Sequence, residues 1–183
     1  MKSTELIERL HKHRRWVNQG LLQAAAKLNG HQLQQEFPMG QGSIWKSLTH
    51  LYGAEFVWLE ALLGNEQPIA TGDAVGKLPG NQDGEKPIGG LAELKTRWEE
   101  LESRWSTYVS SLTSASLKET IYKRNSVTGE RIPNRRVDIL IHVCTHAQYT
   151  TAQVMNMLRH VGVETLPDTM LTAYARDELF ESD

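Results

Sequence analysis

The sequence predicts an all-α fold, a four-helix bundle that forms one domain over residues 1–183. Four long segments repeat apolar residues at spacings of three, four and seven, as helices with one buried face do. One of them, residues 135–161, is apolar nearly all round, which predicts that it lies at the centre of the fold, covered by neighbours on every side or by neighbours and a partner chain. At 183 residues and 39% apolar content, the chain suffices for one domain with a sizeable core and is short for two.

The first helix is predicted over Glu5–Leu28, because its apolar residues follow the helical period and an Asn-Gly pair follows it. A basic run at residues 11–15 interrupts this pattern. We interpret that run as a solvated face, the usual role of such runs. Its histidines, His11 and His13, are assigned no role, and the same holds for His31 and His160.

The second helix is predicted from a cap at Ser43 to Leu63, with Gly64 at its end. His50 lies within a seam of small residues, which leaves space around its imidazole ring. The following residues, 64–90, contain seven glycines and three prolines. A connection of this length predicts a crossover that lets the second and third helices run parallel.

The third helix is predicted over Leu91–Leu112 from its stripe of leucine, tryptophan and valine. A small β-hairpin is predicted over Glu119–Ile132, with its turn at residues 125–129. The Ile132-Pro133 pair then breaks the run.

Asn134 is predicted to cap the fourth helix, and Gly162 is predicted to end it. A short C-terminal helix is predicted over Pro167–Phe180. Four of its side chains are expected to pack back on the bundle: Met170, Leu171, Tyr174 and Leu179.

Two histidines of the fourth helix have the spacing of a chemical site. His142 and His146 are four residues apart, so on a helix their side chains point the same way. Helical bundles build metal sites from side chains on facing helices, which suggests that His50 meets this pair around a divalent metal. Neutral imidazole suits zinc, nickel, copper or iron. The competing interpretation is a set of core histidines, each satisfied by one hydrogen bond.

Composition argues against several other classes. A net charge of −2 disfavours nucleic acid as a partner. No apolar run approaches the roughly 20 residues of a membrane helix, and the N-terminus has no apolar core of a secretory signal. Cys144 is the only cysteine, so no intrachain disulfide can form, and we interpret it as a small packing residue. A cytoplasmic location is the expectation.

Several short segments, taken in order and spacing, carry a family resemblance. They are Arg15-Trp16-Val17-Asn18, Gly42-Ser43-Ile44, Leu48-Thr49-His50-Leu51, Phe56-Val57-Trp58-Leu59, Leu140-Ile141-His142-Val143-Cys144-Thr145-His146, then Gln153, Leu158, Gly162, Pro167-Asp168 and Tyr174. The chain resembles the DinB-like (DinB/YfiT-like) family of four-helix-bundle metalloproteins over nearly its whole length. The resemblance implies a bundle with a long crossover between helices two and three, a homodimer, and a pocket at one end where three histidines hold a metal.

The resemblance also implies which residues bind the metal. His50 matches the ligand from the second helix, and His146 matches the first of two ligands from the fourth helix. The remaining ligand of the family falls on Thr150, which departs from the family pattern. Three alternatives follow: His142 replaces the missing ligand, Thr150 positions a water or ligates weakly, or the site is vestigial and free of metal.

Two functions follow from the resemblance. The first is a metal-dependent enzyme, a thiol S-transferase or hydrolase, that uses zinc or nickel and a small-molecule thiol ligand. Tyr149 and the crossover would shape its pocket. The alternative is a non-catalytic small-molecule-binding bundle with a degenerate metal site at Thr150. An apolar side of the fourth helix, formed by Ile141, Cys144 and Met155, is compatible with a homodimer.

Overall fold

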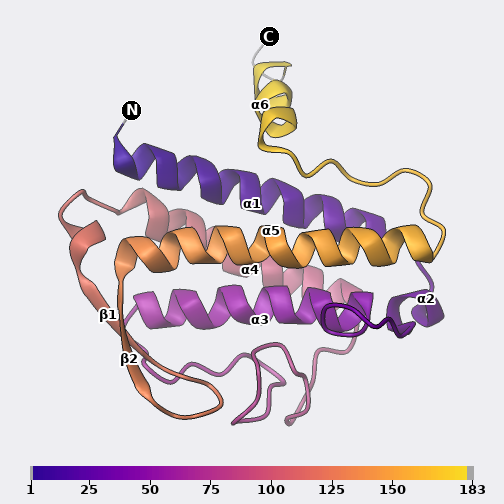
Figure 1. Cartoon of the computed structure of the whole chain (residues 1–183), viewed down its shortest axis with the longest axis horizontal. Coiled ribbons are helices and arrows are strands. Elements are labelled where there is room, and N and C mark those ends of the chain that lie inside the picture. Colours follow the sequence, from indigo (N-terminus) through magenta and orange to yellow (C-terminus); the bar gives the residue numbers. More distant parts are fainter. Residues whose placement is uncertain (1, 181–183) are drawn as a thin grey trace.

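The computed structural model describes residues 2–180, which are mostly helical with one small antiparallel sheet (Figure 1). Four long helices lie side by side: α1 (Ser3–Ala25), α3 (Ile44–Leu62), α4 (Leu91–Ser110) and α5 (Arg136–His160). Helices α1 and α3 each contact both α4 and α5, so the four enclose a common core. The prediction of a mainly helical fold is confirmed.

Shorter elements connect these helices. They are α2 (Gly30–Gln34), the 3₁₀ turn η1 (Ser116–Lys118), β1 (Thr120–Arg124), β2 (Arg131–Arg135) and α6 (Leu171–Phe180). The predicted hairpin is confirmed, because β1 and β2 pair antiparallel. The sequence did not predict α2, which has only five residues and lies where a loop was expected.

The helix ends follow the predicted signals only in part. Helix α1 ends at Ala25 and not at Leu28, and Asn29, predicted to help stop it, instead caps α2. Helix α6 begins at Leu171 and not at Pro167.

Ser43 caps α3 by accepting a hydrogen bond from the Lys46 amide at 3.1 Å. The prediction that Asn134 caps the fourth helix is wrong, because β2 continues through Pro133 and Asn134 to Arg135. A proline fits within β2 because both strands of a two-stranded sheet are edge strands.

Helices α3 and α4 run parallel, as the long crossover predicted. The indole nitrogen of Trp98 donates to Glu55 at 2.9 Å, and further along both helices Arg104 pairs with Glu60. The partners advance together in sequence, which only a parallel pair allows. In Figure 1 the crossover, residues 63–90, returns along α3 before α4 begins.

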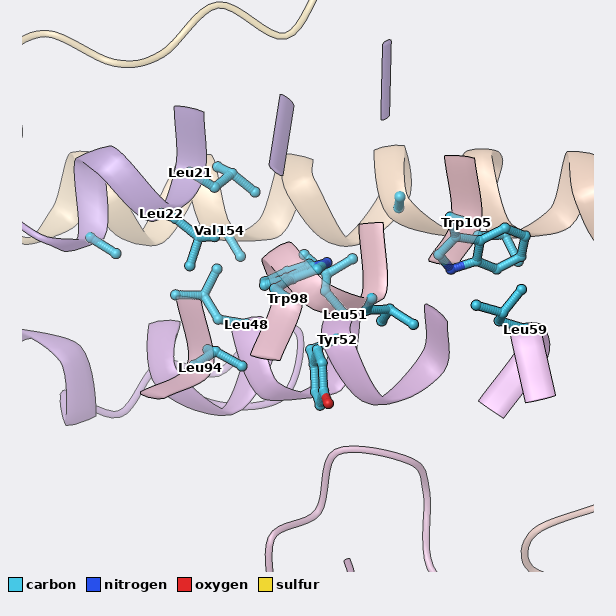
Figure 2. Packing of buried hydrophobic residues seen from close by; sticks show 14 of the residues in the cluster. Leu21, Leu22, Leu48, Leu51, Tyr52, Leu59, Leu94, Trp98, Trp105 and Val154 are labelled. Atoms are coloured by element: carbon cyan, nitrogen blue, oxygen red, sulfur yellow. The ribbon is translucent and has the colours of Figure 1, made fainter. Parts of the chain in front are cut away.

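The core lies between the four long helices (Figure 2). Buried leucine, tryptophan and valine side chains from each helix fill it: Leu21, Leu48, Leu51, Leu59, Leu94, Trp98, Trp105 and Val154. Within the chain one side of α5 is open, and Tyr149 there is 69% exposed, so neighbouring helices alone do not cover this helix. Its cover by a partner chain stays a prediction. Of the side proposed for a homodimer, Cys144 is buried within the chain while Ile141 is exposed, so the homodimer stays a prediction.

Two further predictions about exposure are wrong in part. The basic run of α1 is solvated only at Lys12 and Arg15, whereas His11, His13 and Arg14 are buried, the last at 2% exposure. On α6, Tyr174 packs as predicted, against Trp16 with ring centroids 5.8 Å apart. The other three side chains expected to pack there, Met170, Leu171 and Leu179, are exposed. Helix α6 contacts α1 among the long helices, so only the face carrying Tyr174 is covered. No helix within residues 2–180 has the length and apolar character to cross a bilayer.

Candidate metal centre

His50 projects from α3 and is held by the crossover. Its Nδ1 atom donates a hydrogen bond to the backbone carbonyl of Pro79 at 2.8 Å. This hydrogen bond requires the ring proton to be on Nδ1, so in the neutral ring the Nε2 atom carries the lone pair. A histidine whose second nitrogen is engaged by a carbonyl is typical of metal ligands, since that bond fixes both tautomer and ring orientation.

The crossover reaches His50 because two glycines let it lie directly on α3. A Cβ atom built on Gly53 would come within 2.8 Å of the Gly80 Cα atom, so neither position leaves space for a side chain. Gly80 also has a φ of +80°, a conformation that favours glycine. Asp73 secures the same turn, accepting a hydrogen bond from the Gly80 amide at 2.6 Å. The two glycines and Asp73 therefore determine the position of the Pro79 carbonyl.

His146 of α5 faces His50 across the two helices. Their Nε2 atoms lie 3.2 Å apart, and the rings meet edge to face at 68°. Two imidazole nitrogens that bind one zinc ion tetrahedrally, each at about 2.0–2.1 Å, lie roughly 3.3 Å apart. Burial lowers the pKa of His146 to about 4, and repulsion from His50 and His142 adds to this shift. His146 is therefore neutral at pH 7, the form that binds a metal.

His142 lies one turn before His146, at the exposed edge of the same region. The two ring centroids are 5.7 Å apart, and His142 also meets Trp58 edge to face at 5.4 Å. Partial burial lowers the pKa of His142. All three predicted histidines line one cavity of about 270 Å³.

Four parts of the chain form the wall of this cavity, which we call the histidine cavity. Helices α3 and α5 contribute the histidines and Trp58, the crossover contributes Leu78 and Pro79, and the hairpin contributes residues 123–127 and 132. The described lining residues include no aspartate or glutamate. Imidazole, lysine and arginine groups are therefore the ionisable groups in its wall.

The two other residues that the sequence associated with the site lie elsewhere. Thr150 is buried at 2% exposure and is not among the lining residues. Tyr149 points to solvent and does not shape the cavity, contrary to the expectation, whereas the crossover does. Tyr149 is three residues beyond His146, so it lies about 60° around α5 from the face that carries His142 and His146.

The donor atoms present suit a divalent metal such as zinc or nickel. Two imidazole Nε2 atoms face each other at a separation close to that of two ligands of one ion, and a carbonyl orients one ring. Within residues 2–180 no three His, Cys, Asp or Glu side chains are grouped as a ready three-ligand set. The pair of His50 and His146 is thus the part of the centre that is already assembled.

Lys123 is a cavity residue that sequence reasoning missed. It lies on β1, where alternate side chains face the helices, and it is 7% exposed with its Nζ atom 5.3 Å from the Trp58 ring. The sequence did contain a signal. In the strand Thr120–Arg124 the residues Ile121 and Lys123 share a face, so an inward apolar residue predicts an inward lysine.

A buried polar cluster in the core was missed as well. Arg14 of α1 donates to both carboxylate oxygens of Glu102 at 2.9 and 2.8 Å and pairs with Glu55, which also accepts from Asn18 at 2.8 Å. Burial raises the pKa of Glu102 to about 7 despite the opposing effect of Arg14. An alternating four-three spacing that continues the apolar seam could have revealed these residues: Ile7, His11, Arg14, Asn18, Leu21 and Ala25.

Cys144 has the packing role that the sequence suggested. It is buried in α5, and burial raises the pKa of its thiol to about 12. A thiol that stays protonated at neutral pH is a poor nucleophile.

Comparison with known proteins identifies relatives at the level of a family. The family model described as DinB family matches residues 1–178, nearly the entire chain. Among curated proteins no match was found.

Proposed function

The chain belongs to the DinB family, and from this premise we propose that it is a metal-dependent enzyme whose zinc or nickel ion is held by His50, His142 and His146. One observation carries the proposal. The Nε2 atoms of His50 and His146 face each other at 3.2 Å while the carbonyl of Pro79 engages the other nitrogen of His50. A ring held at one nitrogen by a carbonyl, with a second imidazole aimed at its other nitrogen, is the arrangement expected of two ligands of one metal ion.

His142 is the third ligand in this proposal. It lines the same cavity as the facing pair and lies on the same face of α5 as His146, one turn away. Thr150, which occupies the position of the remaining family ligand, is buried outside the cavity lining. The site is therefore shifted by one turn toward the start of α5.

Thiol transfer is the reaction that the cavity supports best. A bound divalent metal would supply Lewis acidity and hold a thiol in its deprotonated form. The described wall contains no carboxylate to act as a general base, and a reaction whose nucleophile is deprotonated on binding needs none. The chain's own residues orient the histidines, and Ala54, Val57 and Trp58 provide an apolar side to the cavity.

The test is metal content measured by elemental analysis of tag-free protein. We expect about one zinc or nickel ion per chain in the wild type, and its loss in His50→Ala and His146→Ala. His31→Ala is the matched control, because His31 is exposed on α2 away from the cavity. S-transfer from a small thiol to an aryl halide should depend on the same two histidines.

The contrary result is equally clear. If the wild type takes up no ion after zinc and nickel are supplied, the metal-dependent enzyme is refuted. His50 and His146 would then be a hydrogen-bonded pair in a metal-free binding pocket, as the non-catalytic alternative requires.

A further inference from the structure

Lys123 is a buried cation at a position where a strand normally carries an apolar residue. The side chains of β1 alternate: Tyr122 faces solvent beneath the Arg131 guanidinium, 3.5 Å from the ring centroid, while Ile121 and Lys123 face the helices. Across the hairpin Lys123 pairs with Ile132, which also lines the histidine cavity. The fold therefore directs an ammonium group into the cavity wall.

The groups around this ammonium are neutral. Its Nζ atom donates to the backbone carbonyl of Arg124 at 3.0 Å and to the Ser126 hydroxyl at 3.3 Å, and it lies over the Trp58 ring. Among residues 2–180 no carboxylate forms an ion pair with Lys123, although other cations of the chain, including exposed ones, have such partners. Lys123 is thus buried without a counter-charge.

Such an arrangement is rare, because lysine is almost never buried unless it is paired. The charge is not balanced by the rest of the cavity wall either. The described lining residues include no aspartate or glutamate. A ligand in the cavity can supply the counter-charge that the described residues around Lys123 lack.

We propose that the histidine cavity binds a small molecule with a carboxylate or phosphate group, and that Lys123 holds this oxyanion. This proposal names the substrate class of the proposed enzyme. It rests on the proposed function only in the question of which end of the bound ligand reacts. The oxyanion accepts hydrogen bonds from the Lys123 ammonium, as charge-assisted bonds to oxyanions do.

Trp58 relates this oxyanion site to the candidate metal centre. Its indole ring contacts the Lys123 ammonium at 5.3 Å and the His142 ring at 5.4 Å. A ligand bound to Lys123 therefore lies along Trp58 with its other end toward the histidines. A cavity of about 270 Å³ limits the ligand to a compact molecule.

The first test is calorimetric titration with succinate, inorganic phosphate and uncharged succinamide. It is carried out on protein as purified and after removal of metal by a chelator. We expect the wild type to bind at least one anion and to reject succinamide in both states. Lys123→Met should weaken anion binding at least about tenfold, whereas Lys123→Arg and Lys118→Met, a change at an exposed lysine of η1, should stay within about threefold of the wild type.

The two anions identify the group that is recognised: tighter succinate binding indicates a carboxylate, and tighter phosphate binding a phosphate. The proposal is overturned if the wild type prefers neither anion over succinamide, or if Lys123→Met binds as the wild type does. Because the metal-free protein is also titrated, this result is independent of whether the histidines bind zinc or nickel.

A second measurement needs no variant and so does not depend on correct folding of Lys123→Met. In the wild type the preferred anion should slow reductive methylation of Lys123, and mass spectrometry of peptides measures the extent of methylation. Methylation of Lys118 in the same sample should be unchanged. Equal labelling of Lys123 with and without the anion would refute its role.

Discussion

The backbone of Gly80 lies so close to that of His50 that a Cβ atom on Gly80 would come within 2.5 Å of the His50 amide nitrogen. This contact brings the neighbouring carbonyl of Pro79 onto the Nδ1 atom of His50. The orientation of a candidate metal ligand therefore depends on a residue that has no side chain.

We predict that Gly80→Ala weakens zinc binding about 10- to 100-fold, because the displaced crossover loses the hydrogen bond that orients His50. The measurement is competition with a chromogenic chelator. Gly76→Ala is the control, since Gly76 has the same φ of +80° but a Cβ atom at that position would meet nothing within 4 Å. Equal zinc affinity in the two variants would show that the crossover does not orient the ligand.

The identity of the third ligand can be decided by two substitutions on α5. His142→Ala is expected to weaken zinc binding by about 10-fold or more, because it removes an imidazole from the cavity wall. Thr150→Val should change the affinity less than about twofold, because Thr150 is buried outside the described lining. The opposite order of effects in the same chelator assay would assign the ligand to Thr150.

Arg14 is expected to be essential for stability. Arg14→Met leaves Glu55 and Glu102 buried without their shared cation, which should lower the free energy of unfolding by about 3–5 kcal/mol. Urea unfolding followed by circular dichroism measures the change. Arg15→Met alters the adjacent exposed arginine and should stay within about 0.5 kcal/mol of the wild type. Similar losses in both variants would mean that the ion pairs add no stability.

Stability should also depend on pH through His11. Burial, with a contribution from Arg14, lowers the pKa of His11 to about 3, whereas an unfolded histidine titrates near 6.5. Between these values the unfolded chain binds the additional proton, so the free energy of unfolding falls as pH falls, by up to about 1.4 kcal/mol per pH unit. Glu102, with its raised pKa, acts in the opposite direction between about pH 4.5 and 7, and His146, with its lowered pKa, acts in the same direction as His11, so the wild-type curve is a sum of several effects.

The comparison with His11→Gln isolates the histidine. Glutamine can still donate to the Leu140 carbonyl, which accepts from His11 at 3.2 Å, but it does not titrate. In urea unfolding at pH 7, 6 and 5, the wild type should therefore lose more stability than the variant toward acid. Parallel curves for the two proteins would contradict the buried, neutral His11.

Much of the fold could be predicted because the spacing of apolar residues along the chain indicates which side of each helix is buried. The helices, the parallel crossover and the hairpin all follow from apolar spacing and from glycine and proline. The gathering of His50, His142 and His146 at one cavity was also predicted, from the spacing of the last two and the small residues around the first.

What periodicity misses is the partner that makes a buried charge stable. Arg14 lies at a core position, but its burial depends on Glu55 and Glu102, which are distant in sequence. A run of basic residues was therefore interpreted as a surface. Lys123 was missed for a related reason: a five-residue strand gives little evidence of which face is inward, and no residue nearby in sequence identifies its counter-charge.

The hairpin and the crossover meet at Glu66, outside the helical core. The Glu66 carbonyl accepts from the Arg124 amide at 2.8 Å, and its carboxylate takes two hydrogen bonds from Arg131, both at 2.8 Å. The helices thus carry the histidines, while these two linked segments carry most of the remaining wall. Exchange of the turn at residues 125–129 for other sequences would therefore alter ligand preference while leaving the helices that carry the histidines intact, which makes this hairpin the natural site for a directed-evolution library.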